Sequence, residues 1–262
     1  LTANYNTAVG RQAAQSLTSG ALNTIVGAFS GDALVEGGRN AVLGYNCLSA
    51  EDAHGYNVAI GYEALKVQDA GVNAYNIAIG YETGIAVTTG DQNILIGGFA
   101  GHDMNSSQDN VVIGYNALSA ETTRGRSVAI GYESLKLQTG ADEDPYNVAV
   151  GYQAGTGVTS GKFNVLMGAE AGEALATGSY NVAVGHQALM TEDQYGKNTA
   201  IGYQALRLLN SGSDGQNTAI GYQAGKALTT GISNVLIGST TGDALEGGSS
   251  NVAVGNFALS AE

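Results

Sequence analysis

Few side chains in this sequence have the type and spacing that catalysis or metal binding requires. The three histidines, His54, His102 and His186, occur at unrelated places, and Cys47 is the single cysteine. Metal sites need clustered ligands, and these residues do not cluster along the chain. The acidic run 142–144 offers carboxylates of the kind that bind calcium, but a solvated loop is the simpler interpretation. We therefore predict no catalytic residue, no metal site and no cofactor, and a non-enzymatic protein.

A short repeat dominates the sequence. The string Asn-x-x-φ-Gly, in which φ is Ile, Val, Leu or Met, occurs fifteen times, usually with a 17-residue spacing. Positions are counted below from its first residue, so the glycine is at position +4. Ser127 begins one copy, and the others begin at Asn6, Asn23, Asn40, Asn57, Asn76, Asn93, Asn110, Asn147, Asn164, Asn181, Asn198, Asn217, Asn234 and Asn251. A fixed period of this kind indicates a solenoid or another repeat architecture.

A second, longer period groups the repeats in fours. Three of the steps between repeats are longer than the others by two or three residues, which places insertions at about 66–75, 136–146 and 207–216. We expect these insertions to project from one side of the stack. The chain then divides as one array over 1–262: a partial unit 1–39, super-repeats 40–109, 110–180 and 181–250, and a partial unit 251–262. Neither end has an atypical capping sequence, so we predict a fragment of a longer fibre.

The repeat predicts short strands and excludes helices. Asn57-Val58-Ala59-Ile60-Gly61 alternates and contains β-branched residues, as strands do. Glycine recurs every eight or nine residues and no helical stripe is present. One unit cannot bury its apolar face alone, whereas stacked units share a core. We predict an all-β fold, a β-solenoid (β-roll) of about fifteen 17-residue coils that rises about 4.8 Å per coil.

The recurring residues have structural explanations. Each Asn could pass amide hydrogen bonds to the Asn of the next coil, forming a structural ladder, or could cap a turn through its own backbone; both remain open. The glycine at +4 supplies a positive φ or a close backbone approach. Cys47 takes a position that holds Ala64 in another unit, so we expect a small buried filler. Aromatic residues at +5, such as Tyr62, and His186 in the same position are expected to form packed columns.

The fourth repeat type carries Ile or Leu at +2 and no tyrosine at +5. One such repeat has Leu95 at +2 and Gly98 at +5, whereas a repeat of another type has Ala59 at +2 and Tyr62 at +5. Because cores are packed to near-crystalline density, we hypothesise that positions +2 and +5 share one packing space.

Charge limits the partners. The net charge of −13 disfavours nucleic acid and anionic membrane, which need clustered Lys and Arg. The sequence contains no stretch of 18 apolar residues, so no transmembrane helix is predicted.

The units Asn198-Thr-Ala-Ile-Gly-Tyr-Gln-Ala-Leu206 and Asn217-Thr-Ala-Ile-Gly-Tyr-Gln-Ala-Gly225 resemble repeats of bacteriophage tail-fibre proteins. They are also similar to the head repeats of YadA-like trimeric autotransporter adhesins, whose coils carry Val-Ala-Ile-Gly. The resemblance covers essentially the whole chain and implies a parallel homotrimer of left-handed β-rolls with a role in attachment. The 17-residue coil is longer than the coils of the adhesin heads, which leaves the handedness and the trimer packing open.

Apolar residues on both faces of a strand, such as Val58 and Ala59, also suggest burial against a second chain. A single-chain solenoid with a thin core is the rival. We expect an extracellular structural shaft or head segment of a phage tail fibre. Its partner is the chain itself, and any cell-surface receptor is bound through other regions of the longer protein. The alternatives are a bacterial trimeric adhesin or surface filament and, more remotely, an ice-binding solenoid, for which threonine at +1 is too sparse (Thr7, Thr24, Thr199 and Thr218).

Overall fold

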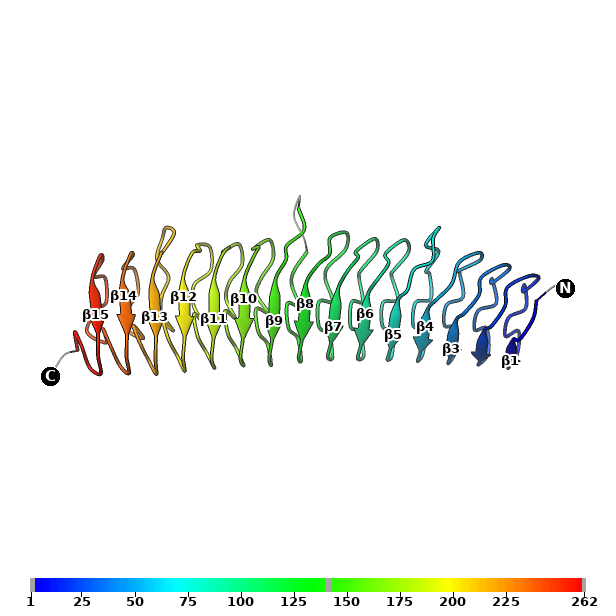
Figure 1. The fold of residues 1–262 in the computed structure, drawn as a ribbon, viewed down its shortest axis with the longest axis horizontal. Helices are drawn as coiled ribbons and strands as arrows, with labels where there is room; N and C mark the ends of the chain where they lie inside the picture. Colours follow the sequence, from blue (N-terminus) through cyan, green and yellow to red (C-terminus); the bar gives the residue numbers. More distant parts are fainter. Residues whose placement is uncertain (1–2, 140–142, 261–262) are drawn as a thin grey trace. The chain divides into compact units, whose positions relative to one another are not determined.

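The computed structural model describes residues 3–139 and 143–260 (Figure 1). Over these residues the regular structure is entirely β, in strands of three residues. The strands are β1 (Thr7–Val9), β2 (Thr24–Val26), β3 (Ala41–Leu43), β4 (Val58–Ile60), β5 (Ile77–Ile79), β6 (Ile94–Ile96), β7 (Val111–Ile113), β8 (Val128–Ile130), β9 (Val148–Val150), β10 (Val165–Met167), β11 (Val182–Val184), β12 (Thr199–Ile201), β13 (Thr218–Ile220), β14 (Val235–Ile237) and β15 (Val252–Val254). Residues 3–139 and 143–260 contain no helix that could span a membrane.

The chain forms two compact units, Leu1–Ser127 with β1–β7 and Val128–Glu262 with β8–β15. Within each unit the strands pair in chain order and in parallel, one strand per coil (Figure 1). Equivalent residues pair directly: Ala59 with Ala78 in the first unit, and Leu166 with Ala183 in the second. The predicted all-β β-solenoid, with its repeats stacked in register, is confirmed within each unit. A coil is named below by its first residue.

The strand is short because its side chains alternate between two environments and glycine ends it. In β4, Ala59 at +2 is completely buried, whereas Val58 and Ile60 at +1 and +3 are half-buried on the outer side. Gly61 follows with φ of 140°, and a Cβ built on it would lie 2.0 Å from the carbonyl oxygen of Gly80 in the next coil. A positive φ and a close backbone approach therefore both require glycine at +4.

Tight turns continue the coil with further left-handed residues, most of which are not glycine. Glu63 at +6 has φ of 55°, Leu65 at +8 has φ of 49° and Tyr56 at +16 has φ of 64°. Non-glycine residues seldom adopt this region, so their recurrence in coil after coil is a property of this fold. These turns carry the chain around the core and return it to the next strand.

The core explains why the fourth repeat type differs. Leu95 at +2 is completely buried, and Gly84 and Gly101 occupy the +8 positions next to it. A Cβ on Gly84 would lie 2.7 Å from Cδ1 of Leu95, and a Cβ on Gly101 would lie 3.1 Å from Cδ2. Other coils combine Ala59 with Leu65 in the same two positions. The leucine side chain therefore enters the core from +2 in some coils and from +8 in others.

The hypothesis that +2 and +5 share a packing space is wrong. Ala78 at +2 is completely buried, while Tyr81 at +5 of the same coil is 49% exposed on the outer surface. Position +2 faces the core and position +5 faces outward. A large side chain at +2 is instead accommodated by a small residue at +8.

The insertions lie at corresponding places in their own coils. A Cβ on Gly71 or on Gly212 would meet nothing within 4 Å, so both loop tips project into solvent. Figure 1 shows the loops near these residues extending past the neighbouring coils of the same unit. Residues 140–142 lie outside the described residues. They are part of the insertion at 136–146 and include Asp142, the first residue of the acidic run 142–144. That all three loops share one side of the whole chain stays a prediction.

Candidate functional site

The outer side of the strands is an apolar surface. In each unit the side chains at +1 and +3 line up along the parallel sheet, and we call this the outer strand face. Leu43 is 50% exposed, Met167 is 43% exposed and Ile94 is 37% exposed, whereas the +2 residues between such positions are buried. Parallel sheets are normally covered on both faces, whereas this face of the described strands stays partly exposed.

Beside this face, the +5 residues form the aromatic columns predicted from the sequence. In the first unit the ring of Tyr62 stacks on those of Tyr45 and Tyr81, at centroid distances of 5.4 and 5.1 Å. In the second unit Tyr203 stacks on His186 and Tyr222 at 5.5 and 5.2 Å. The planes in these pairs lie within 11° of parallel, so the rings cover each other's faces.

Asparagines at position 0 form a hydrogen-bonded row inside each unit, which we call the asparagine ladder. Asn164 is completely buried, and its Oδ1 accepts a hydrogen bond from the backbone N–H of Asn181 at 2.9 Å. Its Nδ2 donates to the carbonyl oxygen of Gly178 at 2.9 Å, and its own N–H donates to Oδ1 of Asn147 at 2.9 Å. The side chain thus connects coils and also caps a turn, the two roles left open by the sequence.

The row is continuous within each unit and most of its members are buried. Asn6 and Asn251 are half-buried, and the asparagines at 23, 40, 57, 76, 93, 110, 147, 164, 181, 198, 217 and 234 are at most 2% exposed. Ser127 lacks the amide side chain but its N–H still donates to Oδ1 of Asn110 at 3.0 Å.

We expect Asn164→Ala to lower the free energy of unfolding by about 2–5 kcal/mol, because two buried backbone groups lose their partner at about 1–3 kcal/mol each. The half-buried Asn251 is the matched control, since water can replace its contacts, and Asn251→Ala should cost below about 1 kcal/mol. Chemical denaturation of the two variants measures the difference. Equal destabilisation would show that the ladder contributes nothing beyond a local contact.

Three buried glutamates are the site residues that sequence reasoning missed. Glu51, Glu121 and Glu192 are all 0% exposed and stand at +11 of the first coil of each super-repeat. Oε1 of Glu51 accepts the N–H of His54 at 3.0 Å, and its Oε2 accepts the N–H of Ala70, in the next insertion, at 3.3 Å. The signal was available, because these glutamates recur once in each super-repeat, at a position where most other coils have apolar side chains.

Glu192 makes the equivalent connection in the second unit. Its carboxylate accepts hydrogen bonds from the N–H and the Oγ–H of Ser211, at 3.1 and 2.9 Å, and from the N–H of Tyr195 at 3.2 Å. Burial raises the pKa of Glu192, and these hydrogen bonds oppose that rise. Because Ser211 lies in the insertion at 207–216, the glutamate fixes the base of that loop to the coil before it.

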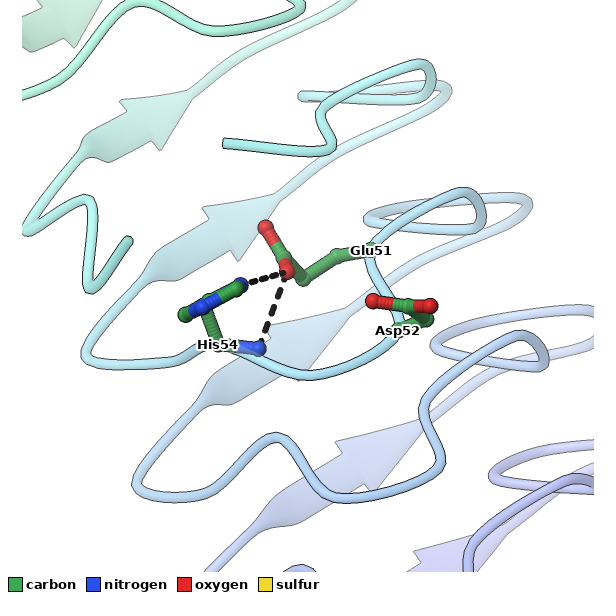
Figure 2. Close-up of side chains that lie close together, drawn as sticks. All are labelled: Glu51, Asp52 and His54. Atoms are coloured by element: carbon green, nitrogen blue, oxygen red, sulfur yellow. Dashed lines mark hydrogen bonds and ion pairs between the residues drawn. The ribbon is translucent and has the colours of Figure 1, made fainter. Parts of the chain in front are cut away.

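Glu51, Asp52 and His54 come together as Figure 2 shows, with ligand atoms within 4.8 Å of one another. The prediction that no potential metal ligands cluster is wrong for these three. Nδ1 of His54 lies 3.5 Å from Oε1 of Glu51, the oxygen that also accepts the His54 N–H. This oxygen is thus already engaged by the protein. The positions of Asp52 and His54 hold Thr122 and Arg124 after Glu121, and Asp193 and Tyr195 after Glu192. The histidine is therefore not part of the repeat.

The remaining candidates stay apart. His102 lies at +9 of its coil with Nδ1 2.6 Å from Oδ1 of Asp103, and His186 belongs to an aromatic column. Cys47 is completely buried, as predicted for a small filler, and its Sγ–H donates to the carbonyl oxygen of Gly61 at 2.6 Å. Thr83 makes the same hydrogen bond from its own coil to Gly97. Burial raises the pKa of the Cys47 thiol, which keeps it protonated.

Over the described residues, the geometry therefore offers a repeated apolar surface and repeated internal ladders. No family model matches the chain, and comparison with curated proteins and with solved structures found no match either.

Proposed function

We propose that this chain is a structural segment of an extracellular attachment fibre, most closely of the phage tail-fibre type, in which copies of the chain assemble in parallel as a homotrimer. The observation that carries the proposal is the outer strand face, an apolar surface repeated at every coil. Ile201, Ile220 and Ile237 in consecutive coils are each 36–37% exposed on it. Contiguous apolar surface of this kind marks a protein–protein contact.

The second copy is the occupant that best fits this face. A partner with the same 17-residue period presents an apolar side chain at each coil, so the match is kept along the whole stack. The polar groups of the strands are already used, since neighbouring coils pair in parallel and the asparagine ladder joins them. Assembly through the face therefore buries side chains without leaving backbone groups unsatisfied.

The choice of a phage fibre over a bacterial adhesin rests on the resemblance of the repeat units. Under this proposal an antibody against the chain labels the tail fibres in electron micrographs of the particles that encode it. Labelling confined to a bacterial surface would instead support the adhesin.

Assembly itself is testable with charge variants. We expect the protein to elute with three times the mass of one chain in light scattering, and the triple variant Ile79→Asp, Ile96→Asp, Ile113→Asp to fall to the mass of one chain. Each buried carboxylate in a trimer would cost several kcal/mol. The control adds the same kind of charge on exposed turns, in Ser106→Asp with Thr123→Asp, and should remain trimeric. A wild-type protein that is monomeric at all concentrations would refute the homotrimer.

A further inference from the structure

A shallow pocket lies where the aromatic column of the first unit is interrupted. The column runs through Tyr45, Tyr62 and Tyr81, but the +5 position of the next coil is Gly98 and the aromatic ring moves to Phe99 at +6. The ring of Phe99 lies 5.3 Å from that of Tyr81 at 68° and 5.7 Å from that of Tyr115 at 88°.

This change of angle turns the ring of Phe99, which is half-buried and whose centroid lies 5.7 Å from that of the His102 ring. Rings in the regular column cover one another's faces, so none of them presents a face sideways. Phe99 is nearly perpendicular to both neighbours and points its edges toward them, so its own faces are turned away from the column direction. The pocket beside it is open to solvent, has a volume of about 350 Å³ and is lined by Phe99, His102, Asp103, Tyr115, Asn116 and Ser119.

The polar groups of the pocket are varied and close together. The carboxylate of Asp103 and the imidazole of His102 lie 2.6 Å apart, and Oε2 of Glu82 lies 3.7 Å from Nε2 of His102. Asn116 adds an amide and Ser119 a hydroxyl, so the lining contains both donors and acceptors. A volume of this size is at the lower end for small-molecule sites.

We propose that this pocket binds a neutral hexopyranose residue of a glycan. One side of a pyranose ring presents C–H groups that pack on an aromatic face, and its hydroxyls donate and accept hydrogen bonds around the rim. Phe99 supplies the face, while Asp103, Asn116 and Ser119 supply the polar groups. An anionic sugar or a phosphate is disfavoured, because Glu82 and Asp103 are near and the chain carries a net charge of −13.

A similar angled ring contact occurs a second time in the first unit, but there Cζ of Arg11 lies over the Phe29 ring, 5.2 Å from its centroid. Phe29 meets Tyr45 at 5.8 Å and 78°, and Asn46 and Ser49 follow as Asn116 and Ser119 do. Four coils, or about 19 Å along the stack, separate the two places. Ala33 stands where the pocket at Phe99 has Asp103, and Arg11 lies over the Phe29 ring, so any binding at Phe29 should be weaker.

The test uses saturation-transfer NMR of the whole chain with the methyl glycosides of glucose, galactose, mannose and N-acetylglucosamine, and with sialyllactose as the anionic probe. We expect at least one neutral glycoside to bind, with a Kd in the millimolar range, about 1 mM. The variant Phe29→Gln, Phe99→Gln, Asp103→Ala should weaken it at least about tenfold, or 1.4 kcal/mol.

The substitutions are compatible with the fold, because the chain itself has Gln204 at +6 and Ala120 at +10. Phe163→Gln is the control: it removes an aromatic ring outside the pocket at +16, where the chain has Gln92, and binding should be unchanged. Absence of binding to the wild-type protein, equal binding to the triple variant, or a preference for sialyllactose would overturn the proposal. None of these outcomes bears on the trimer, which is measured by mass, so the two proposals fail separately.

Discussion

Gly61→Ala is expected to lower the free energy of unfolding by about 3 kcal/mol or more. Two causes add together. Alanine is strained at φ of 140°, at about 1–3 kcal/mol, and its Cβ would lie 2.0 Å from the carbonyl oxygen of Gly80. The clash is with backbone, which cannot move without breaking the pairing of β4 and β5.

Gly71→Ala separates these causes. Gly71 also has a positive φ, 68°, but its Cβ would meet nothing within 4 Å, so only the backbone strain of about 1–2 kcal/mol applies. Guanidinium unfolding followed by circular dichroism, with hydrogen exchange at β4 and β5, measures both variants. If the two lose the same stability, the close approach of the coils at +4 is unimportant and backbone conformation alone explains the glycine.

A double-mutant cycle at Gly225 and Leu236 tests the packing between position +8 and position +2 of the following coil. Leu236 is completely buried, and a Cβ on Gly225 would lie 2.8 Å from its Cδ1. Leu236→Ala opens a cavity and should cost about 2–5 kcal/mol. Gly225→Leu overpacks the same space and should cost about 1–3 kcal/mol. The double variant recreates the natural pair of Leu65 at +8 and Ala78 at +2 of the following coil, and Leu65 has φ of 49°, so a leucine is tolerated in this backbone.

The double variant should therefore be at least about 1–2 kcal/mol more stable than the sum of the single variants predicts. Denaturation midpoints of the four proteins give the coupling energy. Tyr222→Ala combined with Leu236→Ala serves as the control, because Tyr222 at +5 is 53% exposed and should show no such coupling. Coupling at Tyr222 and none at Gly225 would restore the original hypothesis about positions +2 and +5.

The stack and its register could be predicted from the sequence because each coil repeats the same local instructions. A β-branched strand and a glycine at +4 recur at a fixed spacing, and stacking is the arrangement that buries every copy. The compensation between +2 and +8 could not be found in the same way. Leu95 fills the space above Gly84 of the preceding coil, and this contact depends on how one coil lies on another.

The buried glutamates were missed for a different reason. A carboxylate in a turn such as that at Glu51 is expected to face solvent, since burying an unpaired charge is costly. The side chain of Gln68 and the backbone N–H groups of His54 and Ala70 compensate for burial, and the two backbone groups leave no trace in the sequence. The saccharide pocket was hidden as well. The shift of an aromatic residue from +5 to +6 at Phe99 was visible, but the resulting angle between the rings was not.

The hydrogen bonds between coils have a mechanical consequence. In each unit the strands pair side by side, so these bonds point along the stack, and a pull on the two ends of a unit loads them one coil at a time. Each 17-residue coil that opens lengthens the chain by roughly 50 Å, at about 3.3–3.6 Å per residue. A single chain would therefore yield by serial peeling under small forces. A shaft made of several chains joined along their outer strand faces would resist, because the load must then shear apolar contacts in many coils together.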